Sequence, residues 1–529
     1  MVTASIHSVY TLEAKNHNKH IIQPPVFTTK SICGYFGSRF PSLFVPKEEL
    51  AQYTYKDIFN PFHTLGEVSA KQWNFFALGF VAWTWDAFDF FTVSLNAHNI
   101  AHSLGRTVKD ITWGITLVLM LRTIGAIGFG IWGDTKGRKY PYIANLSLLI
   151  VIQIGTGFVQ TYQQFLAVRA LFGVAMGGLY GICAAEALTD APKNSRGIMS
   201  GMFQEGYAFG YLLAVVFQRA IGDTTKKGWR SLFWFSAGPP VIFIIWRYFT
   251  PETDSFIRQR ERFNDNAAAK NSKSKEFKSQ ARKALNQYWL IIVYLVVLMA
   301  GFNFMSHGSQ DLYPTLLTNQ LGYSPDRSTV TNAVANLGAI TGGIIFGHFS
   351  TFIGRRLSIL VACVIGGACI YPWAFTKGSG INAGAFFLQF GVQGAWGVIP
   401  IHLNELSPPQ FKSFVAGVAY QLGNLASSAS STIEATIGEN FPLPPTAEGV
   451  PRYDYGKTMA IFIACVFVFV MIITFLGPEN RGADLGIERD DVMDEEFMDD
   501  DEDLEQERKK STDESIDENK EHVQHVEAV

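Results

Sequence analysis

The polar side chains that could do chemistry gather at the end of one apolar stretch. Residues 288–302 are almost all apolar, and residues 303–315 then read NFMSHGSQDLYPT. At helical spacing, Asn303, His307 and Asp311 lie four residues apart on one face, with Ser306 and Gln310 beside them. Such groups are costly in lipid and usually face a ligand, a partner or water. We therefore expect this strip to face the inside of the protein.

The types of these side chains indicate a site for an acid and a proton. A carboxylate ligand needs hydrogen-bond donors or positive charge. Histidine changes its charge near neutral pH, and a buried aspartate can do so when it is desolvated. We predict that His307 and Asp311 bind and release a proton. The alternatives are that His307 only makes an interhelical hydrogen bond and that Asp311 only caps the helix end.

Further charged residues lie inside other apolar stretches. Arg122, within TLVLMLRTIGAIGFG, must find an anion, either from a ligand or from the protein. Asp86 and Asp89 are three residues apart and are its candidate partners in the protein. A direct contact with a substrate carboxylate and a permanent pair with Asp86 both stay open. Glu186 and Glu205 are additional acids that could carry a proton.

The composition indicates a membrane protein. The chain of 529 residues is 48% hydrophobic and only 17% charged, well below the charge of water-soluble domains. Residues 478–529 hold 21 acidic and 6 basic side chains, so the rest of the chain is net positive. The polar gap from 252 to 287 is basic, which predicts that it and both termini are cytosolic; Lys226, Lys227 and Arg230 fall on the opposite side.

Apolar windows long enough to span a bilayer predict an all-α membrane protein with twelve helices in two six-helix halves. The predicted spans are 73–98, 111–133, 140–160, 163–188, 197–218, 231–250, 287–311, 327–350, 357–376, 382–405, 413–436 and 457–477. The predicted regions are a cytosolic tail (1–72), the first half (73–250), a basic linker (251–286), the second half (287–477) and an acidic disordered tail (478–529).

The two halves resemble each other at a constant offset. GIWGDTKGRK begins at Gly130 and GHFSTFIGRR begins 217 residues later. Gln204 and Gly206 recur as Gln421 and Gly423 at the same distance. This offset favours internal duplication, and transporters built in this way bind substrate between the halves near mid-membrane.

GIWGDTKGRK resembles the loop signature of the major facilitator superfamily. RALFG (169–173) is similar to a fourth-helix motif of the same superfamily, and the second loop copy has Thr351 where an aspartate is expected. The resemblance implies that these loops latch one conformation, whereas a simple basic loop is the alternative. The implied gating residues are Gly130, Asp134, Gly137, Arg138, Lys139, Arg355 and Arg356.

The strip after residue 302 resembles the seventh-helix signature of the fungal lactate and pyruvate permeases, the Jen-type carboxylate–proton symporters. This resemblance implies symport of a short-chain monocarboxylate and a proton across the plasma membrane by alternating access. A dicarboxylate such as succinate or malate is the alternative, and a facilitator of neutral solutes is a weaker one. The implied substrate-binding residues are Asn303, Ser306, His307, Gln310, Arg122, Gln421 and Asn424. The candidate proton-coupling residues are His307, Asp311, Asp86 and Glu205.

The sequence also gives expectations about enzymatic activity, cofactors and modification of the tail. Ser306, His307 and Asp311 lie within one helix and cannot form a catalytic triad, so we expect no enzymatic activity. We expect no cofactor, metal or nucleic acid, with the proton gradient as the energy source and the lipid bilayer as surroundings. Ser511, Thr512 and Ser515 predict phosphorylation of the acidic tail. Nearby lysines predict ubiquitination that controls turnover, and a transporter-like sensor stays open as an alternative.

Overall fold

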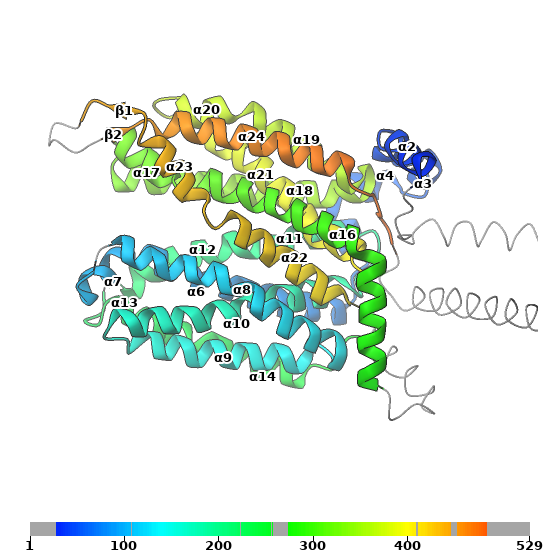
Figure 1. Cartoon of the computed structure of the whole chain (residues 1–529), viewed down its shortest axis with the longest axis horizontal. Coiled ribbons are helices and arrows are strands. Elements are labelled where there is room, and N and C mark those ends of the chain that lie inside the picture. Colours follow the sequence, from blue (N-terminus) through cyan, green and yellow to red (C-terminus); the bar gives the residue numbers. More distant parts are fainter. Residues whose placement is uncertain are drawn as a thin grey trace, which may run out of the picture.

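The computed structural model of the protein describes residues 28–483 apart from 107, 223, 255, 258–272, 409–410 and 446–451. Within this part, the long helices run side by side along one direction (Figure 1). A short antiparallel hairpin joins β1 (Pro442–Leu443) to β2 (Arg452–Tyr453). The tail serines, threonine and lysines predicted as modification sites lie outside the described residues.

The first half of the chain crosses the molecule six times. Two of these crossings each consist of two consecutive helices. Its elements are α6 (Ala70–Leu95), α8 (Val108–Lys136), α9 (Lys139–Gly157), α10 (Tyr162–Leu188), α11 (Arg196–Gln204) with α12 (Gly206–Phe217), and α13 (Trp229–Ser236) with α14 (Gly238–Phe249). Short α7 (Ala97–Leu104) follows α6, and a π-helical turn, η3 (Gln218–Gly222), follows α12.

The second half repeats this arrangement. Its elements are α16 (Lys273–Gln310), α18 (Pro325–Ile353), α19 (Arg355–Ala368) with α20 (Ile370–Phe375), α21 (Gly380–Leu406), α22 (Lys412–Ser427) with α23 (Ser430–Gly438), and α24 (Tyr455–Leu476). Short α17 (Tyr313–Thr315) and η5 (Leu316–Gln320) follow α16. The predicted twelve crossings in two halves are confirmed.

Helix α16 begins 14 residues before the predicted start of its span. Residues 273–286 include four lysines, two alanines, one arginine, one leucine, one glutamine and one glutamate, which are good helix formers. The length of an apolar stretch shows only the part of a helix that crosses lipid. A polar extension of the same helix cannot be detected from it. The region predicted as a linker therefore contains the first turns of α16.

Nine helical segments of the described chain are long and apolar enough to cross a membrane. The other three crossings are α6, α11–α12 and α22–α23. Helix α6 carries Asp86 and Asp89, the second crossing is interrupted at Glu205, and the third is interrupted at residues 428–429. These polar or broken crossings supply much of the candidate site described below.

Glycines let the second and fourth crossings of each half pack backbone to backbone. A Cβ on Gly125 would lie 1.8 Å from the carbonyl oxygen of Val174, and a Cβ on Gly342 would lie 2.1 Å from that of Phe390. Gly125 and Gly342 are 217 residues apart, the offset of the sequence repeat. The same close contact therefore recurs in both halves, as duplication predicts.

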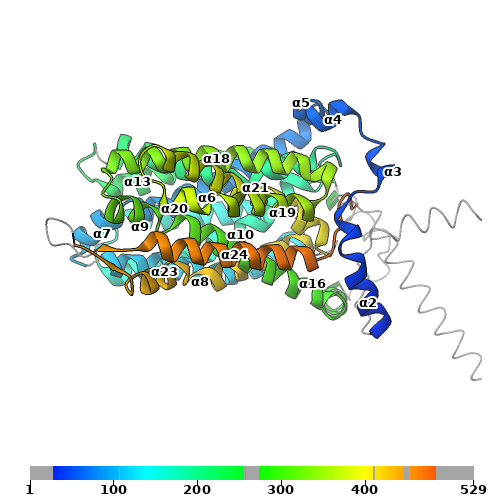
Figure 2. The ribbon, with the colours of Figure 1, turned by 90° about the horizontal axis from the view of Figure 1, so that it is seen from above.

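The bundle has two distinct ends, and the one with the chain's peripheral segments is here termed the tail face. It carries α2 (Thr29–Ser38), η2 (Pro41–Leu43), α3 (Lys47–Leu50), α4 (Tyr55–Phe59) and α5 (Pro61–Leu65). Helix α2 runs across the ends of the long helices (Figure 2). The Tyr35 hydroxyl donates to the Leu476 carbonyl (2.8 Å), which holds α2 at the end of α24. The opposite end, with α7 and the β1–β2 hairpin, is the hairpin face.

Candidate functional site

The two halves are sealed against each other near the tail face. The carboxylate of Asp134 on α8 accepts hydrogen bonds from the backbone N–H groups of Ser413 (3.2 Å) and Phe414 (2.8 Å) at the start of α22. The Ser200 hydroxyl on α11 donates to the Gly397 carbonyl (2.8 Å) and accepts from the N–H of Ile401 (3.0 Å). These bonds run from one half to the other.

Glycine contacts close the same interface. A Cβ on Gly181 would lie 2.4 Å from the Ser413 carbonyl oxygen, and a Cβ on Gly201 would lie 2.3 Å from that of Gly343. On the hairpin face, Arg219 and Asp326 form a longer ion pair of 3.8 Å between side chains that are 74% and 91% exposed. The protein is therefore in a conformation closed at the tail face.

The predicted pair of His307 and Asp311 forms within this interface. The Nδ1 of His307 lies 3.1 Å from Oδ2 and 3.3 Å from Oδ1 of Asp311. Asn424 on α22 interacts with the imidazole, and its amide donates to the Gln421 side chain (3.3 Å). The side chains of His307 and Asp311 are 15% and 38% exposed, whereas Gln421 and Asn424 are buried. Exposure thus falls from the hairpin face inward.

The other predicted residues of the strip make hydrogen bonds within the second half. Gln310 donates to the Gln389 side chain (3.0 Å), and the Ser306 hydroxyl accepts from Gln393 (3.4 Å). The Asn303 amide donates to the Met299 carbonyl of its own helix (2.8 Å). The sequence analysis missed Gln389 and Gln393, although two amides four residues apart in an otherwise apolar span are the signal that marks them. These contacts fix α16 against α21.

Arg122 is buried near the site and makes no close ion pair with an acid among the described residues. Its side chain is 1% exposed, Nη2 lies 2.6 Å from Sδ of Met176, and the guanidinium lies 4.9 Å from the centre of the Phe90 ring. Both oxygens of Asp86 are without a hydrogen-bond partner in the described chain, so Arg122 and Asp86 form no close ion pair, although the charge of Arg122 acts on the Asp86 carboxyl. The charge of Arg122 also acts on His307, in the opposite half. A buried cation in this state is suited to an anionic ligand.

The remaining intramembrane acids have different surroundings. Asp89 interacts with the side chains of Gln153 and Ser236 and with the charge of Arg169. Glu186 forms a buried ion pair with Arg247 (2.9 Å), which gives it a structural partner.

Glu205 lies at the break between α11 and α12 and faces the other half. A Cβ on Gly343 would lie 1.9 Å from its Oε1, and its oxygens have no hydrogen-bond partner in the described chain. It is separate from the group formed by His307, Asp311 and Asn424.

The residues predicted to gate lie at the tail face, but only some of them bridge the halves. Asp134 bridges them, and Gly130 gives room for this, because a Cβ there would lie 2.9 Å from the Cα of Phe414. Arg138 donates to the Ala185 carbonyl (3.1 Å) within the first half. The backbone N–H of Lys139 donates to Glu252 (3.0 Å), and Gly137 has a φ of +90° that favours glycine.

In the second half, the loop copy is held by two buried arginines. Nε and Nη2 of Arg355 each lie 3.0 Å from an oxygen of Glu405, in a bidentate pair. The Nε of Arg356 donates to the Thr474 carbonyl (2.9 Å), and its backbone N–H donates to Glu479 (3.0 Å). The chain after α24 reaches back across the interface, because Arg196 of the first half donates to the Ala483 carbonyl (2.9 Å).

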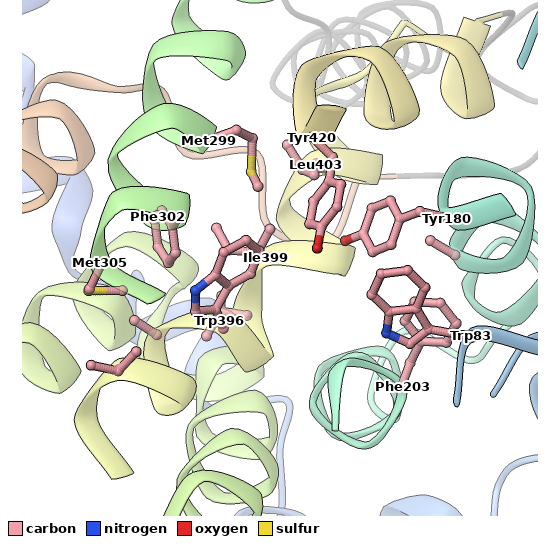
Figure 3. Close-up of a cluster of buried hydrophobic side chains, with 14 of the residues drawn as sticks. Trp83, Tyr180, Phe203, Met299, Phe302, Met305, Trp396, Ile399, Leu403 and Tyr420 are labelled. Carbon is pink, nitrogen blue, oxygen red and sulfur yellow. The ribbon is translucent and has the colours of Figure 1, made fainter. Parts of the chain in front are cut away.

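A layer of aromatic rings separates the site from the tail face. Its members, here termed the aromatic layer, are Trp83, Tyr180, Phe203, Phe302, Trp396 and Tyr420 (Figure 3). Tyr180 and Tyr420 come from opposite halves and stack with ring centres 4.1 Å apart. Tyr420 lies one helical turn before Asn424 on α22, toward the tail face. Passage between the site and the tail face requires this layer to separate.

One group of side chains on the tail face has the spacing of a metal site. Ligand atoms of Asp57, His63 and Glu67 lie within 4.8 Å of one another. Asp57 already caps α4: hydrogen bonds from the side chain and backbone of Thr54 hold the pKa of its carboxyl below the ordinary value. Glu67 accepts from the Asn194 amide (3.2 Å). The bond between Glu67 and Asn194 joins the N-terminal segment to the first half, and we assign the group a structural role.

Breaking the buried Arg355–Glu405 pair should destabilise the protein strongly. Both side chains are at most 1% exposed, so Glu405→Gln leaves a buried guanidinium without its counter-ion, at a cost of about 3–5 kcal/mol. We expect a clearly lower melting temperature in detergent by scanning fluorimetry. Removing both charges, in Arg355→Met with Glu405→Met, should recover much of the loss.

The exposed Arg219–Asp326 pair is the matched control. Arg219→Gln should change the melting temperature little, because exposed pairs contribute about 0–1 kcal/mol. Equal effects of Glu405→Gln and Arg219→Gln would contradict the assignment of Arg355 and Glu405 as a buried pair that secures the second half.

Comparisons with known proteins agree with this architecture. Residues 60–490 match the sugar (and other) transporter family. A carboxylic acid transporter protein homolog of Saccharomyces cerevisiae is 41% identical over 473 residues, covering 87% of this chain and 76% of the yeast protein. The cis,cis-muconate transport protein of Acinetobacter baylyi is 25% identical and covers 73% of this chain and 93% of its own. The structure of the proton:xylose symporter XylE superposes with a TM-score of 0.63 at 16% identity, covering 79% of this chain and 99% of XylE.

Proposed function

This chain is a membrane protein that belongs to the sugar (and other) transporter family of the major facilitator superfamily, and we propose that it carries short-chain monocarboxylates together with protons. Lactate, pyruvate and acetate are the proposed substrates, and the plasma membrane is the proposed location. The observation that carries the proposal is the buried guanidinium of Arg122, which makes no close ion pair with an acid of the described chain and acts electrostatically on both Asp86 and His307.

The arrangement of the site supports binding of an acid. A planar guanidinium can bind a carboxylate through two parallel hydrogen bonds. Asn424 and the imidazole of His307 add groups that can donate to the same ligand. The relative from Saccharomyces cerevisiae is named as a carboxylic acid transporter homolog, which agrees with an acid as substrate. The resemblance of residues 303–315 to the lactate and pyruvate permeases favours a monocarboxylate.

The transport cycle that we propose alternates between the two faces. In the conformation described here, an acid enters from the hairpin face, where His307 and Asp311 are partly exposed. It binds Arg122, and a proton is held by His307 and Asp311. The two halves then rock, so that Asp134 leaves the start of α22 and the rings of Tyr180 and Tyr420 separate. We propose that the tail face is cytosolic, because its connecting loops are rich in lysine and arginine.

A dicarboxylate is the second candidate substrate. The relative from Acinetobacter baylyi is named for transport of cis,cis-muconate, an acid with two carboxylates. A neutral solute fits less well, because it offers no anion to the buried guanidinium of Arg122.

Uptake into proteoliposomes tests the proposal. The purified protein is reconstituted, and labelled lactate, succinate and xylose are supplied with and without an imposed pH gradient. We expect lactate to accumulate above the level of protein-free liposomes only when the outside is acidic, and a protonophore should abolish the accumulation. Succinate in place of lactate would favour the dicarboxylate, and xylose uptake without a pH effect would contradict the proposal.

A further inference from the structure

Glu434 is a buried carboxyl group next to the site that has no role in the scheme above. It is the single charged residue of α23 (SSTIEATIG), it is fully buried, and both of its oxygens lack a hydrogen-bond partner in the described chain. The sequence analysis did not select it, although a lone acid within a predicted span is a recognisable signal. A group of this kind is costly to bury, so its presence needs an explanation.

The surroundings of Glu434 link it to the strip on α16. A Cβ on Gly308 would lie 3.2 Å from Oε1 of Glu434, so the carboxyl group lies against the residue that follows His307. The described titratable or charged groups at this level are His307 and Asp311 on or just after α16, and Tyr455 and Lys457 on α24. Of these, Asp311 acts electrostatically on Glu434.

The groups on α24 are engaged elsewhere. Lys457 lies 4.4 Å from the centre of the Phe441 ring, and Tyr455 interacts with Glu439 and Tyr453. No cation of the described chain therefore compensates a charge on Glu434. An ionised carboxylate would lack both a counter-ion and hydrogen-bond donors, and it would repel the carboxylate of Asp311. The uncharged acid avoids both costs.

We propose that Glu434 is a second proton-binding site, which holds a proton in the conformation closed at the tail face and exchanges it with the Asp311–His307 pair. When the halves rock and the two carboxyl groups come within hydrogen-bonding distance, the Glu434 carboxylic acid gives its proton to the Asp311 carboxylate and becomes ionised. Asp311 then passes the proton to Nδ1 of His307, 3.1 Å away, which becomes an imidazolium. The transfer needs no other reactant. This inference rests on the proposed acid–proton symport.

The test compares two transport modes of Glu434→Gln. Glutamine keeps the shape of the side chain but cannot release a proton. Counterflow, in which external labelled lactate exchanges for internal unlabelled lactate, needs no net proton movement, so we expect it to match the wild type. Accumulation of lactate driven by a pH gradient needs proton release, so we expect it to fall to the level of protein-free liposomes. Glu439→Gln, an exposed acid on the same side, is the matched control and should keep both modes.

Each outcome has one meaning. Normal gradient-driven accumulation by Glu434→Gln would overturn the inference and leave the proposed function intact. Loss of both modes at normal abundance would assign Glu434 to folding or substrate binding, which also overturns it. Absence of lactate counterflow in the wild type would instead contradict the proposed function. If Glu434→Gln fails to fold, Glu434→Asp should shift the pH profile of accumulation, and an unchanged profile would overturn the inference.

Discussion

Replacing Arg122 by glutamine should raise the apparent Km for lactate steeply. Glutamine keeps a hydrogen-bond donor but removes the buried positive charge that the proposed substrate carboxylate would meet. Loss of one member of a buried, hydrogen-bonded charge pair costs about 2 to 5 kcal/mol, which corresponds to roughly 30-fold to several thousand-fold in affinity. Initial rates of labelled lactate uptake over a range of concentrations measure this change.

Two further variants separate substrate binding from a structural role for Arg122. Arg122→Lys keeps the charge but loses the planar fork, so we expect a smaller rise in Km than for Arg122→Gln. Arg219→Gln removes an exposed arginine of the same half and should leave the Km unchanged. An unchanged Km for Arg122→Gln, at normal abundance in the membrane, would mean that the guanidinium does not contact the acid.

Replacing His307 by alanine should abolish lactate accumulation that is driven by a pH gradient. The variant removes the imidazole that pairs with Asp311 and interacts with Asn424, and with it the group that titrates near neutral pH. Accumulation in proteoliposomes at an imposed gradient, compared with protein-free liposomes, measures the loss.

His102→Ala is the control for the His307 prediction. His102 is an exposed histidine on α7 at the hairpin face, and its replacement should leave accumulation intact. If His307→Ala reaches the membrane at normal abundance and still follows the pH gradient, then His307 only makes an interhelical hydrogen bond, which was the alternative at the outset.

These predictions differ in how much of their basis was visible in the sequence. The pairing of His307 with Asp311 could be predicted, because residues four apart on a helix are neighbours whatever surrounds the helix. The twelve crossings could be predicted for a similar reason, since apolar length is a local property that the bilayer thickness makes decisive. The breaks in the crossings at Glu205 and at residues 428–429 did not show in that signal.

The sequence by itself determined the number of crossings, the duplication and the polar face of α16, because each depends on spacing within one segment. Only the tertiary structure decided the partners of the buried charges. It placed Arg122 where its charge acts on both His307 and Asp86 without a close ion pair, paired Glu186 with Arg247, and brought Glu434 against Gly308 of α16. Those neighbours come from helices far apart in the chain, and their contacts follow from how the helices pack, which no spacing within a single segment encodes.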